Sequence, residues 1–430
     1  MLPAGGGRAQ RDTQLPTGLA EEVTSSGMKV RNVVHAAFPV AEYKTRYEKL
    51  QKVMERRNLD AVLVTAKENV VYFSGLETVG WDSKHRPLGC ILPREKGHPV
   101  LVVAESLVHV AGVTSWIDDV RLWGGFKRTG IPHDPVVGIA DAIKDLGLAG
   151  GRIGMEMGYG TRINMSQADF EMLKGLLPDV EIVDAAETIW ELRMIKSPAE
   201  IEAMRKVCMD TCAAYETAFA AMRGGMTERE LAGILLAEFA RLTNFRPGFV
   251  GIRSGKLKYG MMNVPPFENK KLDAGDLVVV DAGATYRDYW CDMMRMASIG
   301  EPDPEAQRFF DVDLQAQRAG MAKIKPGAAA GDICKACLEV IHEAGLGEHA
   351  PSLERVGHGL GMEVHEPPSL ALGSEVEIQP GMILTVEPIF SDLPNYQLGN
   401  FAMEQIMLVT ETGAELLTPF TDKLWVAPVS

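Results

Sequence analysis

The segment from residue 275 to 300 constrains the fold most, because two apolar stretches joined by a short turn each carry an aspartate. The first stretch predicts a strand that ends on Asp281, and the second predicts a strand that contains Asp292. A turn centred on Tyr286 and Arg287 would place the aspartates directly opposite each other, with Cβ atoms about 4.5–5.5 Å apart. Carboxylates that close repel each other unless one is protonated or a cation lies between them. The segment therefore predicts either a metal site or a solvated hairpin, and the apolar run before Asp281 argues against full solvation.

A glycine-rich stretch, RVGHGLGMEVHEPPSL at residues 355–370, contains two of the nine histidines. His358 lies between glycines, which permit close backbone approach. His365 follows, just before a Glu-Pro-Pro sequence that favours an extended exit. A single histidine is usually structural or exposed. Two in one such stretch favour a site, and neutral imidazole is a good ligand for zinc, manganese, cobalt or iron.

Two further carboxylates interrupt apolar strand patterns near the C-terminus. Glu387 ends the strand expected after the Pro380–Gly381 turn, and Glu404 lies within the apolar stretch that precedes the Thr412–Gly413 turn. A carboxylate at the end of a buried strand needs a partner. Each glutamate taken alone is equally consistent with an ordinary salt bridge.

The charge balance excludes several partners. With 44 basic and 58 acidic residues the net charge is −14, which disfavours nucleic acid and anionic membrane surfaces. No apolar run of about 18 residues predicts a membrane span. Six cysteines are too few for a disulfide framework, and the pairs 208/212 and 334/337 have the spacing of helical core residues. We expect a protein of the reducing cytoplasm.

A chain of 430 residues predicts two domains. Residues 1–28 contain no apolar stretch long enough for a signal peptide, and we expect a flexible tail. Strand and helix patterns alternate over 29–190, which predicts an α/β domain. Ser197 and Glu200 form a capping box with proline at the first helical position, so a long helix should begin the second domain, 191–430.

The second domain contains a faint internal repeat. Residues 225–231 and 327–333 each open a helical pattern after a glycine, and they lie 102 residues apart. A duplicated unit of helices and strands would explain the similarity, although two short matches are weak evidence.

Together the four acidic and histidine segments resemble the pita-bread metallopeptidase family, which includes methionine aminopeptidase, aminopeptidase P, prolidase and the metal-free creatinase. The motifs NVVYFSGL and LRMIKSPAEIEAMRK are similar to the prolidase and creatinase branch. The resemblance covers roughly residues 38–425. It implies an α+β pita-bread fold for the second domain, and it implies metal ligation by Asp281, Asp292, His358, Glu387 and Glu404.

The same resemblance implies a dinuclear hydrolase with two divalent ions, which could be manganese, cobalt, iron or zinc. In the family one aspartate chelates the first metal, the histidine and one glutamate serve the second, and the remaining two carboxylates bridge both. Glu387 is the expected general base, and His365 the expected group that binds the substrate carbonyl or stabilises the intermediate. The expected substrate is a small peptide of the Xaa-Pro type or another small amide. Creatinase lacks the metal carboxylates, so a metal-free mechanism is not expected.

Two departures from the prolidase pattern affect the substrate more than the metals. Met262 or Asn263 stands where prolidases have a histidine, and Ala402 and Gln405 flank Glu404 where the family has Arg-Ile-Glu-Asp. A relative that acts on a small non-peptide molecule is therefore the alternative, such as an osmolyte-like amide hydrolase or a dimethylsulfoniopropionate-type lyase. A non-catalytic binding module is a third and weaker alternative, because all five ligands are present.

Other contributions to the substrate site come from the turn and from the first domain. We expect Tyr286 beside His365 and Trp81 from the first domain to contact the substrate. This branch commonly forms homodimers, and a loop with Trp81, His85 and Arg86 could reach the site of a partner subunit. An exposed loop with an aromatic anchor explains the same residues.

Overall fold

The computed structural model describes residues 23–24, 27–28, 36–83, 86–95, 97–124, 130–243, 248–255, 267–350, 353–391 and 398–430. The chain divides into two compact units, residues 1–157 with 161–185, and residues 158–160 with 186–430. The main division falls five residues before the expected boundary at 190. Most of the expected tail lies outside the described residues, although Val23–Thr24 and Gly27–Met28 form the short strands β1 and β2.

The first unit is an α/β layer structure around an eight-stranded mixed sheet with the order β1-β2-β6-β5-β4-β3-β7-β8. The inner strands β3 (Ala61–Val64), β4 (Gly89–Pro93) and β5 (Val100–Ala104) are short, continuous apolar runs, as strands covered on both faces should be. The other strands are β6 (Asp119–Trp123), β7 (Arg152–Met155) and the edge strand β8 (Glu181–Asp184). The helices are α1 (Val40–Arg56), α2 (Lys67–Ser74), α3 (Val108–Thr114), α4 (Pro135–Asp145) and α5 (Gln167–Leu176). The predicted α/β domain is confirmed.

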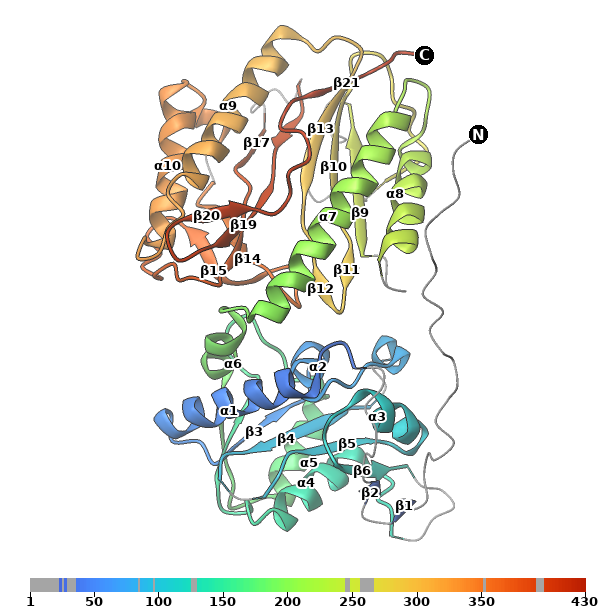
Figure 1. Ribbon diagram of the computed structural model, residues 1–430, viewed down its shortest axis with the longest axis vertical. Helices are drawn as coiled ribbons and strands as arrows, with labels where there is room; N and C mark the ends of the chain where they lie inside the picture. Colours follow the sequence, from blue (N-terminus) through green and yellow to red (C-terminus); the bar gives the residue numbers. More distant parts are fainter. Residues whose placement is uncertain are drawn as a thin grey trace. The chain divides into compact units, whose positions relative to one another are not determined.

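The second unit places helices around two antiparallel-rich sheets (Figure 1). Its helices are α6 (Ala186–Arg193), α7 (Pro198–Ala221), α8 (Glu228–Leu242), α9 (Pro304–Met321) and α10 (Ala330–Glu343). One sheet has the order β21-β13-β10-β9, formed by Trp425–Ala427, Met294–Ile299, Leu277–Gly283 and Phe249–Ser254. The other has the order β15-β14-β16-β19-β20, formed by Glu366–Ala371, Arg355–Gly359, Ile383–Val386, Gln405–Val409 and Ala414–Leu416. The predicted α+β architecture is confirmed.

The predicted start of α7 is confirmed in detail. The Ser197 side chain accepts a hydrogen bond from the backbone N–H of Glu200 at 3.2 Å, and the Ser197 N–H donates to the Glu200 carboxylate at 2.9 Å. Pro198 occupies the first helical position, where no backbone donor is needed. This cap fixes where the longest helix of the second unit begins.

The internal repeat is visible in the structure. Gly225 and Gly327 both adopt positive φ, at 78° and 81°. Two residues after each glycine comes an isolated β-bridge, Thr227 to Lys271 in the first half and Ala329 to Glu377 in the second. Figure 1 shows the two helix pairs, α7 with α8 and α9 with α10, on opposite sides of the strands. The helices and strands α7, α8, β9, β10 and β13 thus correspond to α9, α10, β14, β16 and β19.

The expected register of the aspartate hairpin is wrong by two positions. Asp281 pairs with Met294 rather than with Asp292. The turn is centred on Arg287 and Asp288, which have φ of 55° and 63°, and it joins the small strands β11 (Thr285–Tyr286) and β12 (Tyr289–Trp290). Two successive left-handed residues are characteristic of the type I′ turn, whose twist suits a hairpin. Moving the turn centre by one residue shifts the partner by two, which keeps the side chain on the same face.

The cysteines are core residues, as expected from their spacing. All six are buried and none forms a disulfide. Cys208 and Cys212 lie in α7, and Cys334 and Cys337 lie in α10. Within the described part of the chain, every helix is too short or too polar to traverse a lipid bilayer.

Candidate metal centre

A cavity of about 670 Å³ opens in the second unit. Four of the five predicted ligands line it, namely Asp281, Asp292, Glu387 and Glu404, together with His365. The fifth ligand, His358, lies behind this wall with its Nε2 3.0 Å from a carboxylate oxygen of Glu387. The fold therefore brings together residues that lie up to 123 positions apart in the sequence.

Each predicted ligand lies on a strand of the second unit or directly beside one. Asp281 is in β10, and Asp292 is in the irregular segment between β12 and β13. His358 is in β14. Glu387 follows β16, and Glu404 precedes β19. Strand pairing therefore fixes Asp281 and His358 directly, whereas the other three residues lie just outside paired strands.

The candidate ligand atoms form three overlapping groups, and within each group they lie within 4.8 Å of one another. One group consists of Asp281, Asp292 and Glu404, the second of His358, Glu387 and Glu404, and the third of Asp292, His358 and His365. Glu404 belongs to the first two groups, and Asp292 belongs to the first and the third. Such an arrangement has room for two cations that share a carboxylate.

Without a cation, the negative charges of these buried carboxylates repel one another. Burial, with the charges of Asp281 and Glu387 added, raises the pKa of Asp292 well above its usual range. Burial and the neighbouring carboxylates also raise the pKa of Glu404. The pKa of Asp281 rises to about 6, mainly through burial, although Arg253 opposes the shift. Divalent cations would remove this repulsion and allow all the groups to ionise.

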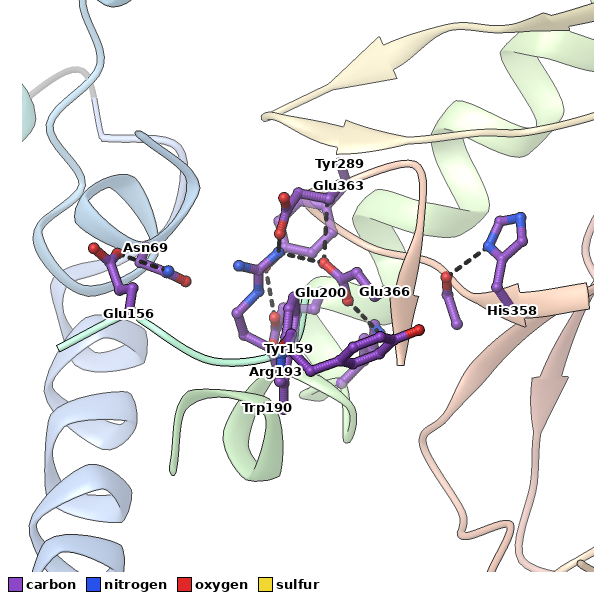
Figure 2. A network of polar contacts seen from close by, with 12 residues as sticks. Asn69, Glu156, Tyr159, Trp190, Arg193, Glu200, Tyr289, His358, Glu363 and Glu366 are labelled. Atoms are coloured by element: carbon purple, nitrogen blue, oxygen red, sulfur yellow. Dashed lines mark hydrogen bonds and ion pairs between the residues drawn. The ribbon is translucent and has the colours of Figure 1, made fainter. Parts of the chain in front are cut away.

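His358 presents a ligand lone pair to these acids. Its Nδ1 lies 2.8 Å from the carbonyl oxygen of Gly359 (Figure 2), so Nδ1 carries the proton in the neutral ring. Its Nε2 is buried and has no hydrogen bond within the described residues, and the same holds for both carboxylate oxygens of Glu404. A buried lone pair that faces carboxylates is unfavourable unless a cation lies between them. These orphaned atoms show that the residues fit a pair of divalent ions.

Glu387 differs from the other acids because the net shift of its pKa is downward. Burial raises the pKa of Glu387, but the neighbouring His358 and Arg355 outweigh burial. An Arg355 guanidinium nitrogen lies 3.3 Å from the Glu387 carboxylate. Glu387 is therefore the carboxylate of the site that ionises most readily.

The glycines around His358 are required by close packing, as the sequence predicts. A Cβ on Gly359 would lie 2.1 Å from the carbonyl oxygen of Pro367. A Cβ on Gly361 would lie 2.7 Å from the Glu366 carboxylate. Larger residues would therefore push the His358 strand away from its neighbour β15.

A buried ionic network anchors the segment that carries His365. The neighbouring Glu366 carboxylate contacts Arg193 at 2.5 Å and Lys196 at 3.2 Å, and Arg193 also contacts Glu363 at 3.0 Å (Figure 2). Burial raises the pKa of Glu366, but Arg193 and Lys196 outweigh it, and the net pKa is lowered. This network fixes the backbone next to His365.

The His365 ring lies on the cavity wall, and its centroid is 4.3 Å from that of His358. Burial, His358 and Arg355 together lower the pKa of His365 to about 4. His365 is therefore neutral near pH 7. A neutral imidazole at this place can donate one hydrogen bond to a substrate oxygen.

Of the other two predicted substrate contacts, Tyr286 is not among the described residues that line the cavity, and the role of Trp81 stays a prediction. Tyr286 lies in β11, where Lys206 Nζ stands 5.1 Å above its ring, and it is absent from the described lining residues. Trp81 belongs to the first unit, and its Nε1 donates to the Leu76 carbonyl at 3.2 Å. In the same loop Arg86 pairs with acids of its own unit, and His85 lies outside the described residues.

Several lining residues were not predicted. Phe249 and Trp290 form an aromatic wall with ring centroids 6.2 Å apart, and Arg253 and Arg355 add two cations. Arg355 lies three residues before His358, so its motif could have revealed it. Phe249 and Arg253 are ordinary residues of strand β9, and only sheet pairing brings them beside Asp281.

The departures around Glu404 can now be placed. Gln405 points to the buried Arg295, whose Nη2 donates to its side-chain oxygen at 2.9 Å, and it also accepts from Thr418 at 2.7 Å. Ala402 is fully buried in β18 (Asn400–Ala402). Met262 and Asn263 lie outside the described residues. The described changes therefore leave the acidic groups themselves intact.

The centre combines four carboxylates and one histidine around a cavity. This arrangement is characteristic of a metal-dependent hydrolase. The family model for metallopeptidase family M24 matches residues 202–411, and the model for the creatinase/prolidase N-terminal domain matches residues 46–195. The chain belongs to metallopeptidase family M24, in its prolidase-like branch with the pita-bread fold, and is a metal-dependent peptidase.

Similar proteins cover nearly the whole chain. The Xaa-Pro dipeptidase of Pyrococcus furiosus is 29% identical over 382 residues, which are 87% of this chain and 98% of that protein. The probable dipeptidase PepE of Mycobacterium tuberculosis is 34% identical over 261 residues, 60% of this chain and 66% of that protein. The crystal structure of dipeptidase PepE from Mycobacterium ulcerans has a TM-score of 0.76 at 27% identity and covers 91% of this chain and all of that one. The prolidase from Pyrococcus horikoshii has a TM-score of 0.73 at 26% identity and covers 88% of this chain and 99% of that one.

Proposed function

We propose that this protein is a dinuclear dipeptidase that cleaves Xaa-Pro dipeptides. The observation that carries the proposal is the pair of adjoining ligand groups that share Glu404 inside one cavity. Similarity to proteins named Xaa-Pro dipeptidase and dipeptidase PepE supports the substrate class. The ligands would be Asp281, Asp292, His358, Glu387 and Glu404, and manganese, cobalt, iron and zinc are all compatible with this donor set.

The chemistry divides between the ions and the chain's own side chains. Bound at these groups, two divalent ions would supply a water of lowered pKa and positive charge for the oxygens of a tetrahedral intermediate. Glu387 is ionised and lines the cavity, so it serves as the general base that accepts the proton of the attacking water. Neutral His365 donates a hydrogen bond to the oxygen of the scissile amide.

The shape of the cavity supports a small substrate with an apolar ring and a negative end. About 670 Å³ is within the usual range for small-molecule sites, roughly 300–1,000 Å³. The Phe249 and Trp290 rings, tilted 40° to each other, offer an apolar aromatic surface for a proline ring. Arg253 and Arg355 offer positive charge to the free carboxylate of a dipeptide.

The proposal is tested with metal-free protein reloaded separately with Mn²⁺, Co²⁺, Fe²⁺ or Zn²⁺. Each form is assayed with Gly-Pro, with dipeptides lacking proline, with Xaa-Pro tripeptides and with osmolyte-like amides. Release of proline from Gly-Pro is the expected result. Turnover of osmolyte-like amides alone would contradict it and favour the non-peptide alternative, for which Met262 or Asn263 in place of the prolidase histidine is the supporting observation.

The cytoplasmic location and the homodimer stay predictions from the sequence. Light scattering coupled to size-exclusion chromatography measures the mass in solution. Twice the mass of the 46.9 kDa chain is the expected value.

A further inference from the structure

Gln317 connects the two segments that carry the glutamate ligands. It lies in α9 and is 1% exposed. Its amide nitrogen donates to the carbonyl oxygen of Val386 at 3.0 Å and to that of Met403 at 2.6 Å. Val386 directly precedes Glu387, and Met403 directly precedes Glu404. Both hydrogens of one amide group are thus used beside two metal ligands.

Tyr215 has the same position relative to the aspartate ligands. It lies in α7 and is fully buried. Its hydroxyl donates to the carbonyl oxygen of Met293 and lies 3.2 Å from that of Val280 and 3.3 Å from that of Ala282. Val280 and Ala282 flank Asp281, and Met293 directly follows Asp292.

The internal repeat makes the two contacts equivalent. Tyr215 lies ten residues before Gly225, and Gln317 lies ten residues before Gly327. The carbonyl oxygens of Val280 and Val386 lie 3.2 Å and 3.0 Å from these two side chains, and each residue lies five positions after a glycine with positive φ, Gly275 and Gly381. The two halves have different side chains at this position, a phenol and an amide, yet the equivalent carbonyl faces the donor in both. The two halves of the repeat therefore share a hydrogen-bond donor at this position, although the side chains that supply it differ in shape.

These donors act where the backbone ladder ends. The pairing of β10 with β13 stops at Asp281 and Met294, and the pairing of β16 with β19 stops at Val386 and Gln405. Beyond the first of these pairs, isolated backbone hydrogen bonds still join the segments, such as Ala282 N–H to the Met293 carbonyl at 3.1 Å. Like-charged carboxylates beside them favour separation of the segments. A buried donor that bridges two carbonyls opposes that separation, because a lost bond would leave buried polar groups unpaired.

We propose that Tyr215 and Gln317 are positioning residues of the metal centre, each holding together the two chain segments that carry the acidic ligands of its own half. The inference rests on the metal ligands of the proposed function but not on the substrate. Outer-shell partners of this kind typically contribute roughly 10- to 100-fold to metal affinity or activity.

The test measures metal binding directly. Metal-free Tyr215→Phe and Gln317→Met are titrated with Co²⁺ by calorimetry, and the visible absorption of the bound Co²⁺ reports the ligand geometry. Tyr215→Phe should weaken Co²⁺ binding by roughly 10- to 100-fold, because Asp281 and Asp292 both contribute ligand atoms. Gln317→Met should weaken both sites, because Glu404 is shared. Both variants should change the Co²⁺ spectrum.

Two matched variants separate positioning from stability. Tyr289→Phe removes a buried hydroxyl that bonds to Glu200 rather than to a ligand strand. Gln307→Met changes a half-buried glutamine of the same helix α9, which bonds to Asp311. Both should keep the wild-type Co²⁺ affinity and spectrum. Equal loss of affinity in these two variants would overturn the inference.

The outcomes distinguish this inference from the proposed function. If wild-type protein binds two ions and both test variants bind them with unchanged affinity and spectrum, the positioning role is wrong. If wild-type protein binds no Co²⁺, the proposed function fails and the positioning role fails with it. Should Gln317→Met not fold, Gln317→Asn keeps the amide but shortens the side chain by one carbon. The same weakening is then expected, and wild-type affinity in that variant would contradict the inference.

Discussion

Glu404 is a buried carboxylate whose two oxygens have no hydrogen-bond partner within the described part of the chain. Burial and the charges of Asp292, Glu387 and Asp281 all raise its pKa. A residue in this environment lowers the stability of the metal-free fold, because its charge is neither solvated nor paired. The same properties make it a strong shared ligand. Function and stability therefore have opposite requirements at this position.

We expect Glu404→Gln to raise the melting temperature of the metal-free protein while weakening metal binding. The amide removes the charge that Asp292 and Glu387 repel, so the metal-free fold gains stability. Metal affinity should fall by more than the roughly 10- to 100-fold that follows loss of an outer-shell partner. Thermal melts with and without added Mn²⁺ measure both effects. A metal-free variant that melts below the metal-free wild type would contradict the argument.

Loss of Asp292 should remove metal and activity together. Asp292 has ligand atoms near Asp281 and Glu404 and also near His358 and His365. We expect Asp292→Ala to lose at least one of the two ions and to lose peptidase activity. Elemental analysis of the purified variant, compared with wild type after the same reloading, counts the ions. Two retained ions would exclude Asp292 as a ligand.

Glu156 makes the first unit sensitive to pH. Its carboxylate accepts a hydrogen bond from the Asn69 amide at 2.8 Å (Figure 2). It also accepts from the backbone N–H groups of Thr65 and Ala66, at 2.8 and 3.1 Å. Burial nevertheless raises the pKa of Glu156 from 4.5 to about 7. The folded protein thus binds this proton more tightly than the unfolded chain does. The stability that Glu156 contributes is complete below pH 4.5 and is lost as the pH rises through 7.

Glu156→Gln isolates this effect because an amide does not titrate. The stability of wild type relative to Glu156→Gln should fall by on the order of 3 kcal/mol between pH 4.5 and pH values above 7. Urea unfolding at several pH values, followed by a probe in the first unit, measures the difference. A difference that does not change with pH would mean that Glu156 has an ordinary pKa in the fold.

At the scale of elements, helix caps and turns decide where the ligands fall. The capping box at Ser197 starts α7, and α7 carries Tyr215 to the strand β10. The type I′ turn at Arg287 and Asp288 sets the register of the strands that carry Asp281 and Asp292. These local sequence signals therefore influence the metal centre, because they set the start of α7 and the register of the strands beside the ligands.

Removing the cap should destabilise the second unit without changing its metal ligands. Ser197→Ala leaves the backbone N–H of Glu200 without its acceptor, so we expect a loss of about 1 kcal/mol in the free energy of unfolding. Thr217→Ala, at an exposed position of the same helix, is the control and should change stability by less than about 0.5 kcal/mol. Denaturant unfolding of both variants provides the comparison. A loss as large in the control would assign the effect to the helix in general.

At the scale of the whole molecule, the chain is two units with separate cores and one metal centre. All five predicted ligands belong to the unit formed by residues 158–160 and 186–430. Ions that bind only the folded state stabilise the part of the molecule whose unfolding releases them. The effect of metal should therefore be confined to one unit.

Removal of metal should lower the stability of the second unit alone. At a free ion concentration 100 times Kd, bound metal adds about 2.7 kcal/mol per site. We expect EDTA to accelerate hydrogen exchange in β10 and β16 and to leave β3 and β5 unchanged. Exchange measured by mass spectrometry with and without EDTA resolves the segments. Equal acceleration in both units would contradict the separation.

The sequence by itself determined the two-domain organisation, the capped helix at Ser197, the internal repeat at Gly225 and Gly327, and the identity of the family. These features depend on local chemistry, since a capping box, a glycine at positive φ and a strand ending on an acid are each written in a few consecutive residues. Motif order carried the resemblance to the family. The fold brings Asp281, Asp292, His358, Glu387 and Glu404 close together, and their role as metal ligands stays a prediction.

Only the tertiary structure decided the hairpin register and the surroundings of the ligands. The register depended on which residues tolerate left-handed φ, and Arg287 gives no such signal in the sequence. Arg253, Phe249, Tyr215 and Gln317 look like ordinary strand or helix residues in the sequence. They reach the site because sheet pairing and helix packing join positions far apart in the chain. Each candidate ligand is thus recognised from a short motif around it. The distances between the ligands and their charge environment are properties of the assembled fold.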